Sequence, residues 1–380
     1  MTWEQARQAL KTHWGYEDFR PPQDAVVRAL LSQRDALIVL PTGFGKSICF
    51  QIPAVIGEGL TLIVSPLIAL MEDQVQDLWR RKLPAACLHS DTDRRLKERI
   101  LKAIAENRLR LLYLSPETLF NLTLWTLLRD PQVRIAGLIV DEAHTLVHWG
   151  ESFRPDYRRL GAVRRTLAKP FAVAAFTATA DPYTQWMLGH VLELQDPEVI
   201  TINPLRSQIR LRIETVWTPL QRQQRLLTFL NQHHPQAGLI YVRTRRDGDD
   251  LVDWLRQRGW TTEVYHGGLA APERRAREQA WLSGSLPFLV CTNAFGMGIN
   301  KPDCRWVLHY HPPLSPTDYI QEVGRAGRDG QPAEALMLVC EPTGALDPSD
   351  QQRQQFFRHQ RQRLHQAALE LLPTLPRAIA

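Results

Sequence analysis

The sequence predicts an α/β protein with two domains, each built on a mainly parallel sheet flanked by helices. Three observations lead to this fold class. The chain has 380 residues, which is enough for two or three domains. Short runs rich in Val, Ile and Leu recur along it, and runs that are apolar at consecutive positions are typical of strands buried on both faces of a parallel sheet. Longer amphipathic segments separate these runs, as helices do between parallel strands.

The first domain is expected to contain the strands nearest the amino terminus. They are the apolar runs at 36–40, 61–65, 110–114, 135–140 and 171–176. Helices are expected between them, for example at 67–83 and 93–106. Strands that alternate with helices in this way form right-handed crossovers in one sheet.

A second set of apolar runs predicts the second domain. These runs lie at 238–242, 262–266, 287–291, 305–310 and 335–340. The stretch 194–213 contains two prolines and no helical period, so we place the boundary near Asn203. The expected segments are therefore 1–203, 204–340 and a tail at 341–380, which begins with turns and continues as one helix to about Leu372.

Composition excludes several classes of protein. The residues are 44% apolar and 23% charged, which is typical of a globular protein and not of a disordered or fibrous one. The longest mainly apolar stretch, 61–71, is interrupted by Ser65 and Pro66 and is too short to cross a bilayer. The amino terminus shows no secretory signal. We therefore expect no membrane partner and a cytoplasmic location.

Cysteine usage and charge add weaker indications. The five cysteines are odd in number and lack the close pairs of zinc sites, so we expect reduced core thiols and no zinc. The net charge of +6 and the pI of about 9.2 are compatible with a polyanionic partner. The basic stretch 151–169 fits a solvated helix face equally well.

The clearest motif is the glycine-rich sequence LPTGFGKS at 40–47, which follows the first strand and precedes a helix. Such a turn directs backbone N–H groups and the helix dipole at phosphates. We expect Thr42, Gly43 and Gly45 to surround the phosphates of a nucleotide. Lys46 would reach the β- and γ-phosphates, and the Ser47 hydroxyl would ligate Mg²⁺.

A second motif, GLIVDEAH at 137–144, places two carboxylates at the end of a buried strand. Ligand-binding groups gather at this edge of a parallel sheet. Asp141 could ligate the same Mg²⁺ as Ser47, and Glu142 could orient and polarise the attacking water. Asp-Glu after a strand also commonly caps the next helix. The phosphate loop upstream favours the catalytic interpretation.

A third motif, YIQEVGRAGRDG at 319–330, contains Arg325 and Arg328. Their spacing predicts that both lie on one face of a helix. An arginine delivered to the γ-phosphate stabilises transition-state charge. Taken alone, two helical arginines are more often surface ion-pair residues.

With these motifs, the chain resembles the superfamily-two helicases and, within them, the RecQ-type DNA helicases. The resemblance covers about residues 3–340 in the family's order and spacing. It is carried further by WGYEDFRPPQ (14–23), VSPLIALMEDQV (64–75), YLSPETL (113–119), FTATA (176–180), GLIYVRTRR (238–246), YHGGL (265–269) and CTNAFGMGINKPD (291–303).

The resemblance implies two tandem RecA-like domains with ATP·Mg²⁺ in the cleft between them. The segment 14–23 resembles the family's adenine-recognition segment, which implies that Gln23 reads the adenine edge. Tyr16 and Arg20 would then pack near the base. Arg325 and Arg328 would arrive from the second domain when the cleft closes.

For DNA, the resemblance implies backbone contacts from Ser65, Ser115 and Thr292, which carry no sequence information. Without it, each Ser-Pro would be interpreted as a simple turn. The stretch 141–158 resembles the family's aromatic-rich loop. Trp149, Phe153 and Arg154 match its positions, where bases stack on aromatic rings. Burial of either ring against the sheet is the alternative.

Three positions depart from the family pattern. Leu40 stands where the full phosphate-loop pattern has glycine, although the compact form without it is common in helicase-type NTPases. Phe44 stands where relatives usually have glycine. Glu151 replaces a usual histidine, which puts the strength of coupling between DNA and ATP hydrolysis in question.

These motifs predict an ATP-dependent DNA helicase or translocase. The family implies 3′-to-5′ movement, single-stranded and forked duplex substrates, a role in recombination or repair, and association with the bacterial nucleoid. An RNA helicase, or a P-loop ATPase that regulates without translocating, remains the alternative. No cysteine follows Cys340, so no zinc module is expected in the tail, and we expect unwinding of short duplexes only. The tail arginines are interpreted as a solvated or interdomain helix rather than a DNA contact.

Overall fold

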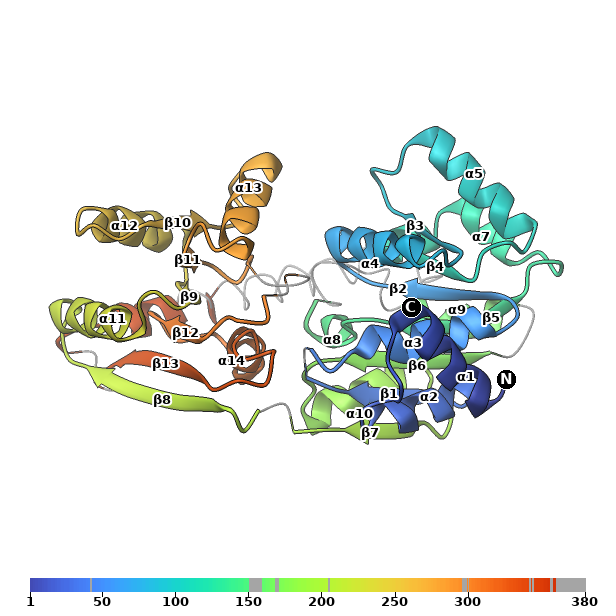
Figure 1. Ribbon diagram of the computed structural model, residues 1–380, viewed down its shortest axis with the longest axis horizontal. Coiled ribbons are helices and arrows are strands. Elements are labelled where there is room, and N and C mark those ends of the chain that lie inside the picture. Colours follow the sequence, from blue (N-terminus) through green and yellow to red (C-terminus); the bar gives the residue numbers. More distant parts are fainter. Residues whose placement is uncertain are drawn as a thin grey trace. The chain divides into compact units, whose positions relative to one another are not determined.

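The computed structural model describes residues 1–41, 43–149, 159–167, 171–203, 206–295, 299, 301–341, 343, 345–355 and 358–359. Thr42, Phe153, Arg154, the side chain of Trp149 and most of the expected tail helix lie outside this part of the chain. The chain divides into two compact units, Met1–Asn203 and Pro204–Ala380 (Figure 1). Each unit is described by itself.

Unit 1 is built on a seven-stranded sheet in the order β3-β4-β2-β5-β6-β1-β7. Every pairing in it is parallel. Because parallel strands end at the same edge, the loops that follow them gather there. The strands are β1 (Ala36–Val39), β2 (Leu60–Val64), β3 (Ala85–Leu88), β4 (Leu111–Leu114), β5 (Ile135–Val140), β6 (Ala172–Thr177) and β7 (Glu198–Thr201).

Helices cover both faces of this sheet, and each face has its own apolar core. Side chains from α1 to α4 pack on one face, and side chains from α5 to α10 pack on the other. The helices are α1 (Trp3–Ala9), the π-helix η1 (Leu10–Trp14), α2 (Gln23–Leu31), α3 (Lys46–Ile56), α4 (Ile68–Arg80), α5 (Arg94–Ala105), α6 (Pro116–Leu119), α7 (Leu122–Leu128), α8 (His144–Trp149), α9 (Gly161–Thr166) and α10 (Pro182–Val191).

Unit 2 is a six-stranded parallel sheet in the order β10-β11-β9-β12-β13-β8. Helices α11 and α12 cover one face, and α13 and α14 cover the other (Figure 1). Its elements are β8 (Ile209–Val216), α11 (Pro219–His233), β9 (Gly238–Tyr241), α12 (Arg245–Arg256), β10 (Thr262–Tyr265), α13 (Ala271–Leu282), β11 (Phe288–Cys291), β12 (Trp306–His309), α14 (Pro316–Val323) and β13 (Ala333–Cys340).

The predicted fold class is confirmed, and every strand expected from an apolar run is present to within two residues. The sequence analysis missed β3, β7 and β8. All three lie at the edges of their sheets. β7 alternates between half-buried and exposed residues, so it lacks the apolar run of a strand buried on both faces. β3 is a four-residue apolar run, AACL, that the sequence analysis overlooked. In β8, buried and exposed residues are mixed. The stretch 194–213, where the boundary was placed, therefore contains β7 and the start of β8, and its lack of a helical period reflects these strands.

The five cysteines are free thiols, and all but the half-buried Cys87 are buried. This agrees with their interpretation as reduced core residues. None of the helices in the described part of the chain is long and apolar enough to span a bilayer.

Candidate nucleotide site and nucleic-acid surface

The glycine-rich loop connects β1 to α3 at the carboxyl edge of the unit 1 sheet. The Leu40 N–H donates to the Thr177 carbonyl of β6 over 3.0 Å, which fixes where the loop begins. Gly43 and Gly45 have φ of +88° and +72°, a region that side chains rarely adopt. The loop therefore turns back and opens α3 at Lys46, whose Nζ donates to the Leu40 carbonyl over 3.1 Å.

Gln23 joins the amino-terminal segment to this loop. Its side chain is buried, Nε2 donates to the Phe44 carbonyl over 2.8 Å, and Oε1 accepts from the Arg20 N–H over 3.0 Å. A Cβ at Gly45 would lie 2.5 Å from that Nε2, so this glycine also permits a close approach. Tyr16 and Arg20 have exposed side chains. The contact of Gln23 with adenine stays a prediction.

Asp141 and Glu142 follow β5, separated from β1 by β6 alone. The Asp141 N–H donates to the Val64 carbonyl over 2.9 Å, and Asp141 Oδ1 accepts from the Glu142 N–H over 3.0 Å. Glu142 has φ of +49°. A non-glycine residue in this left-handed region carries strain of about 1–3 kcal/mol, and such residues cluster at functional sites.

The electrostatics of this pair match a site for a cation or an attacking water. Burial, and next the neighbouring Glu142 carboxylate, raise the pKa of Asp141 to about 7, while the charge of Lys46 acts in the opposite direction. Glu142 Oε2 is buried and accepts no hydrogen bond from any residue in the described ranges. The Nδ1 atom of His144 lies 3.5 Å from it.

The raised pKa of Asp141 predicts how the thermal stability of unit 1 changes with pH when EDTA keeps divalent cations away from the site. Folded Asp141 keeps its proton to about pH 7, whereas its ordinary pKa is 3.8. Between these values the folded state binds more protons, so stability falls as pH rises. Asp141→Asn removes this loss, and we expect it to raise Tm at pH 8 by more than about 2–4 °C, the shift that about 1 kcal/mol gives in a domain of this size. At pH 5 the shift should be much smaller. Thermal melts followed by circular dichroism check this, and equal shifts at both pH values would contradict it.

The side chains near the loop fit a hard divalent cation that accompanies a nucleotide. The donors are the Ser47 hydroxyl and the Asp141 carboxylate, and Mg²⁺ prefers such oxygen ligands, usually together with substrate phosphates. The buried Glu142 oxygen that accepts no hydrogen bond among the described residues agrees with a site where a ligand or water supplies the missing polar contact. Among the described residues, no group of three or more His, Cys, Asp or Glu could hold a metal ion by itself.

Two further polar residues belong to this site and were not singled out from the sequence. His144 Nδ1 lies 3.0 Å from Thr177 Oγ1, and that hydroxyl donates to the Thr179 carbonyl over 3.0 Å. The Thr177 carbonyl also holds the start of the phosphate loop. His144 and Thr177 thus connect the strand that carries Glu142 to the loop that carries Lys46. The sequence signal that could have identified His144 and Thr177 was their position within the motifs GLIVDEAH and FTATA.

The same edge of unit 1 carries the Ser-Pro turns. Ser65 follows β2 and donates its N–H to the Leu114 carbonyl over 3.1 Å. Its hydroxyl is buried, and the Ser115 hydroxyl caps α6 by accepting from the Thr118 N–H. A pocket of about 480 Å³ lies beside both turns, lined by Pro66, Ser115 and Lys97 among others. Pro66 and Ser115 line this pocket, but Ser65 and Ser115 are both buried. The DNA contact of Ser65 and Ser115 therefore stays a prediction.

The arginine motif of unit 2 is not on a helix, so this part of the prediction was wrong. Helix α14 ends at Val323, and Arg325 and Arg328 lie in the turns that follow. Gly324 closes the helix, and Gly327 has φ of +60° with the Gln331 carbonyl 2.9 Å from where a Cβ would lie. The glycines in GRAGRDG therefore favour a turn, and the i, i+3 spacing does not show a helix.

The turn is held by a third arginine, Arg206, which the sequence analysis did not identify. It donates to the carbonyls of Ala326 and Gly324 over 3.1 and 3.0 Å. Arg328 Nη1 donates to the Ile299 carbonyl over 2.8 Å. Burial, followed by the charges of Arg325 and Arg206, lowers the pKa of Arg328 to about 9. Three guanidinium groups gathered in this way favour an anionic ligand.

Thr292 lies at the carboxyl edge of the unit 2 sheet, where β11 ends. Its N–H donates to the Tyr265 carbonyl over 3.1 Å, and its hydroxyl accepts from the Ala294 N–H over 3.4 Å. Thr292 is 6% exposed, so its contact with DNA also stays a prediction. The loops after β9, β10 and β11 share this edge.

Comparison with known families agrees with the geometry of both units. The DEAD/DEAH box helicase family model matches residues 20–186, and the helicase conserved C-terminal domain model matches residues 221–330. Among solved structures, the chain is similar to a DUF1998 helicase bound to DNA, with a TM-score of 0.74 at 17% identity over 90% of this chain and 52% of that one. It is also similar to the helicase Lhr of Mycobacterium smegmatis bound to single-stranded DNA and AMP-PNP, with a TM-score of 0.68 at 21% identity over 92% and 49%. These likenesses show the tandem RecA-like fold.

Relatives of higher identity show the family. The chain is 54% identical to the ATP-dependent DNA helicase RecQ of Synechocystis over 97% of this chain and 78% of that protein. It is 38% identical to the probable ATP-dependent DNA helicase RecS of Bacillus subtilis, of which it covers 66%, and 36% identical to RecQ of Pasteurella multocida, of which it covers 52%. The chain thus spans about half to four fifths of the length of these relatives. It belongs to the RecQ family of ATP-dependent DNA helicases.

Proposed function

We propose that this chain hydrolyses ATP to move 3′-to-5′ on single-stranded DNA and to open forked duplexes, in recombination or repair. The observation that carries the proposal is the Asp141–Glu142 pair beside the phosphate loop, with Glu142 in a left-handed backbone and a buried carboxylate oxygen without a hydrogen bond. Such a group is suited to hold an attacking water. Family membership supports DNA as the polymer. The substrate in turn suggests a cytoplasmic, nucleoid-associated protein.

In this proposal the residues of unit 1 divide the chemistry. Lys46 and the N–H groups of the loop bind the phosphates, and Ser47 and Asp141 hold Mg²⁺, which supplies charge neutralisation when bound. Glu142 orients the attacking water and accepts its proton. Its position is fixed by Thr145, whose N–H and hydroxyl both donate to the Glu142 carbonyl. Arg325 and Arg328 would stabilise the charge on the γ-phosphate from unit 2.

The ATPase is expected to depend on Lys46 for nucleotide binding as well as for turnover. Lys46→Ala removes a positive charge from the phosphates in both the ground state and the transition state. We therefore expect weaker binding of a fluorescent ATP analogue and a lower kcat together. A Lys46→Ala protein that binds the analogue at wild-type affinity would contradict this role.

One comparison of polymers distinguishes this function from its alternatives. ATPase rates are measured with no polymer, with single-stranded DNA and with single-stranded RNA of the same sequence and length. A DNA helicase should be stimulated by DNA, an RNA helicase by RNA, and a regulatory P-loop ATPase by neither. A duplex with a 3′ tail and one with a 5′ tail then test the direction of movement.

A further inference from the structure

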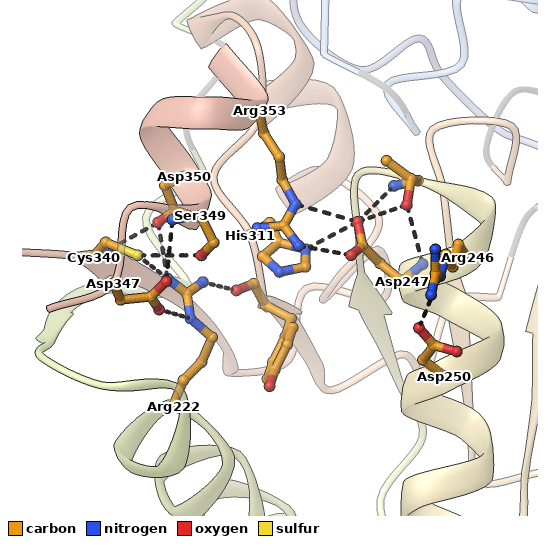
Figure 2. Close-up of polar contacts among 12 residues, drawn as sticks. Arg222, Arg246, Asp247, Asp250, His311, Cys340, Asp347, Ser349, Asp350 and Arg353 are labelled. Carbon is orange, nitrogen blue, oxygen red and sulfur yellow. Dashed lines mark hydrogen bonds and ion pairs between the residues drawn. The ribbon is translucent and has the colours of Figure 1, made fainter. Parts of the chain in front are cut away.

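Two networks of charged side chains hold the segment after β13 against unit 2 (Figure 2). The first is centred on Arg222 of α11, whose side chain is 3% exposed. Arg222 donates to Cys340 Sγ and to the Tyr310 carbonyl, and it pairs with Asp350 over 2.9 Å. Asp350 Oδ2 in turn accepts from the Cys340 N–H over 2.8 Å. The turn and the helix that begins at Ser349 are therefore built into the unit.

The second network lies one helical turn further along. Arg353 Nη2 donates to Asp247 Oδ1 over 2.7 Å, and its Nε donates to Oδ2 over 3.3 Å. The two side chains are 24% and 17% exposed, so this is a largely desolvated ion pair that is expensive to break from one side. The interpretation of the tail arginines as solvated or interdomain was therefore wrong for Arg353.

Asp247 also fixes the loop that precedes α12. Its Oδ2 accepts from the Thr244 hydroxyl over 2.7 Å and from the Thr244 N–H over 3.1 Å. The Asp247 N–H donates back to that hydroxyl over 3.0 Å, which completes a capping box. One carboxylate thus joins the helix from Ser349 to the first turn of α12.

The loop that Asp247 holds runs directly into the first turn of α12, and together they present positive charge at the carboxyl edge of the sheet. Arg245 and Arg246 directly follow Thr244, and both are exposed. The Arg245 guanidinium lies over Gly268, where a Cβ would come within 2.8 Å of Nη1. The loops after β9 and β10 therefore meet. Exposed arginines on a fixed backbone suit the phosphates of a strand.

His311 lies beside the same carboxylate, with Nδ1 3.9 Å from Asp247 Oδ2. Burial, followed by the charge of Arg353, lowers the pKa of His311 to about 3. The imidazole is therefore neutral at pH 7. Burial opposes the charge on Asp247, but the hydrogen bond from Arg353 holds its pKa below the usual value. Arg353 is thus the cation that balances Asp247.

We propose that Arg353, acting through Asp247, is a positioning residue for the basic loop at 243–246, which includes the first two residues of α12. The grip of unit 2 on DNA then depends on the segment that follows its last strand. The inference rests on the proposed function, because it assumes that this loop meets a DNA strand. Arg353 itself need not touch DNA.

The test measures ATPase rate against the concentration of single-stranded DNA for the full chain. We expect Arg353→Ala to raise the half-saturating DNA concentration by about 3- to 10-fold, because the loop loses its orientation. The rate without DNA and the rate at saturating DNA should stay near wild type. Arg353→Lys, which keeps the charge, should recover part of the affinity. Asp247→Ala and the double variant should match each other, because among the described residues Arg353 contacts this loop through Asp247.

Arg256→Ala is the matched control. Arg256 is the last residue of α12, at the opposite end from Asp247, and pairs with Glu263. It should lower thermal stability without changing the half-saturating DNA concentration. If Arg353→Ala shifts that concentration no more than Arg256→Ala, or if its effect adds to that of Asp247→Ala, the inference is wrong while the proposed function stands. A wild-type ATPase that DNA does not stimulate would overturn both.

Discussion

Glu142→Gln is expected to abolish ATP hydrolysis while ATP binding stays close to that of the wild type. The substitution keeps the shape of the side chain and removes its negative charge, and with that charge its capacity to accept a proton. The charge of the phosphate-binding groups is unchanged, so the ground state should be bound as before. We expect kcat to fall by at least about 10³-fold, as general base catalysis and water orientation are both lost.

The measurement is a pair of titrations on the same preparation. Nucleotide affinity is followed by fluorescence of an ATP analogue, and turnover is followed by phosphate release with saturating single-stranded DNA. Glu58→Gln is a suitable control, since Glu58 is exposed and pairs with Arg134 at the surface. A Glu142→Gln protein that hydrolyses ATP at the wild-type rate would refute the assignment of the base.

Arg328→Ala is expected to reduce turnover by about 10³-fold, the lower range for an arginine that acts on a transferring phosphoryl group. The physical reason is the loss of a positive charge that is already partly desolvated, since burial and the two neighbouring arginines lower its pKa to about 9. Arg325→Ala should act in the same direction. DNA affinity should change little.

Arg305→Ala separates this effect from damage to the turn. Arg305 pairs with Asp329, directly after Arg328, and donates to the Pro302 and Pro332 carbonyls. Arg305→Ala should therefore destabilise the same turn without removing a positive charge that is proposed to contact the γ-phosphate. Equal losses of turnover in the two variants would show that Arg328 only supports the fold. Units 1 and 2 expressed separately should hydrolyse ATP far more slowly than the intact chain.

The sequence was most informative where backbone chemistry is local. Glycine at 43 and 45 predicts a turn with left-handed residues, and the structure contains one. Buried strands can be predicted from the sequence equally well, because burial on both faces requires consecutive apolar residues. The position of Asp141 and Glu142 after such a strand followed from the same pattern.

What could not be predicted depends on partners far apart in the chain. The bond from Gln23 to the Phe44 carbonyl and the support that Arg206 gives to the turn at 324–328 have no local pattern. The prediction that Arg325 and Arg328 lie on a helix was based on their spacing alone. It took no account of the three nearby glycines, which favour a turn. In the sequence, Arg353 cannot be told from a solvated arginine, because its partner Asp247 lies far away in the chain and is brought beside it only by the fold.

The left-handed backbone at Glu142 limits which sequences can occupy this position. Without a need for catalysis, the conformation would favour glycine or asparagine and exclude β-branched residues. A library randomised at position 142 and selected only for folding should therefore be enriched in Gly and Asn. The same library selected for hydrolysis should return Glu. The difference between the residues that the two selections return at position 142 shows how strongly selection for catalysis overrides the preference of the backbone.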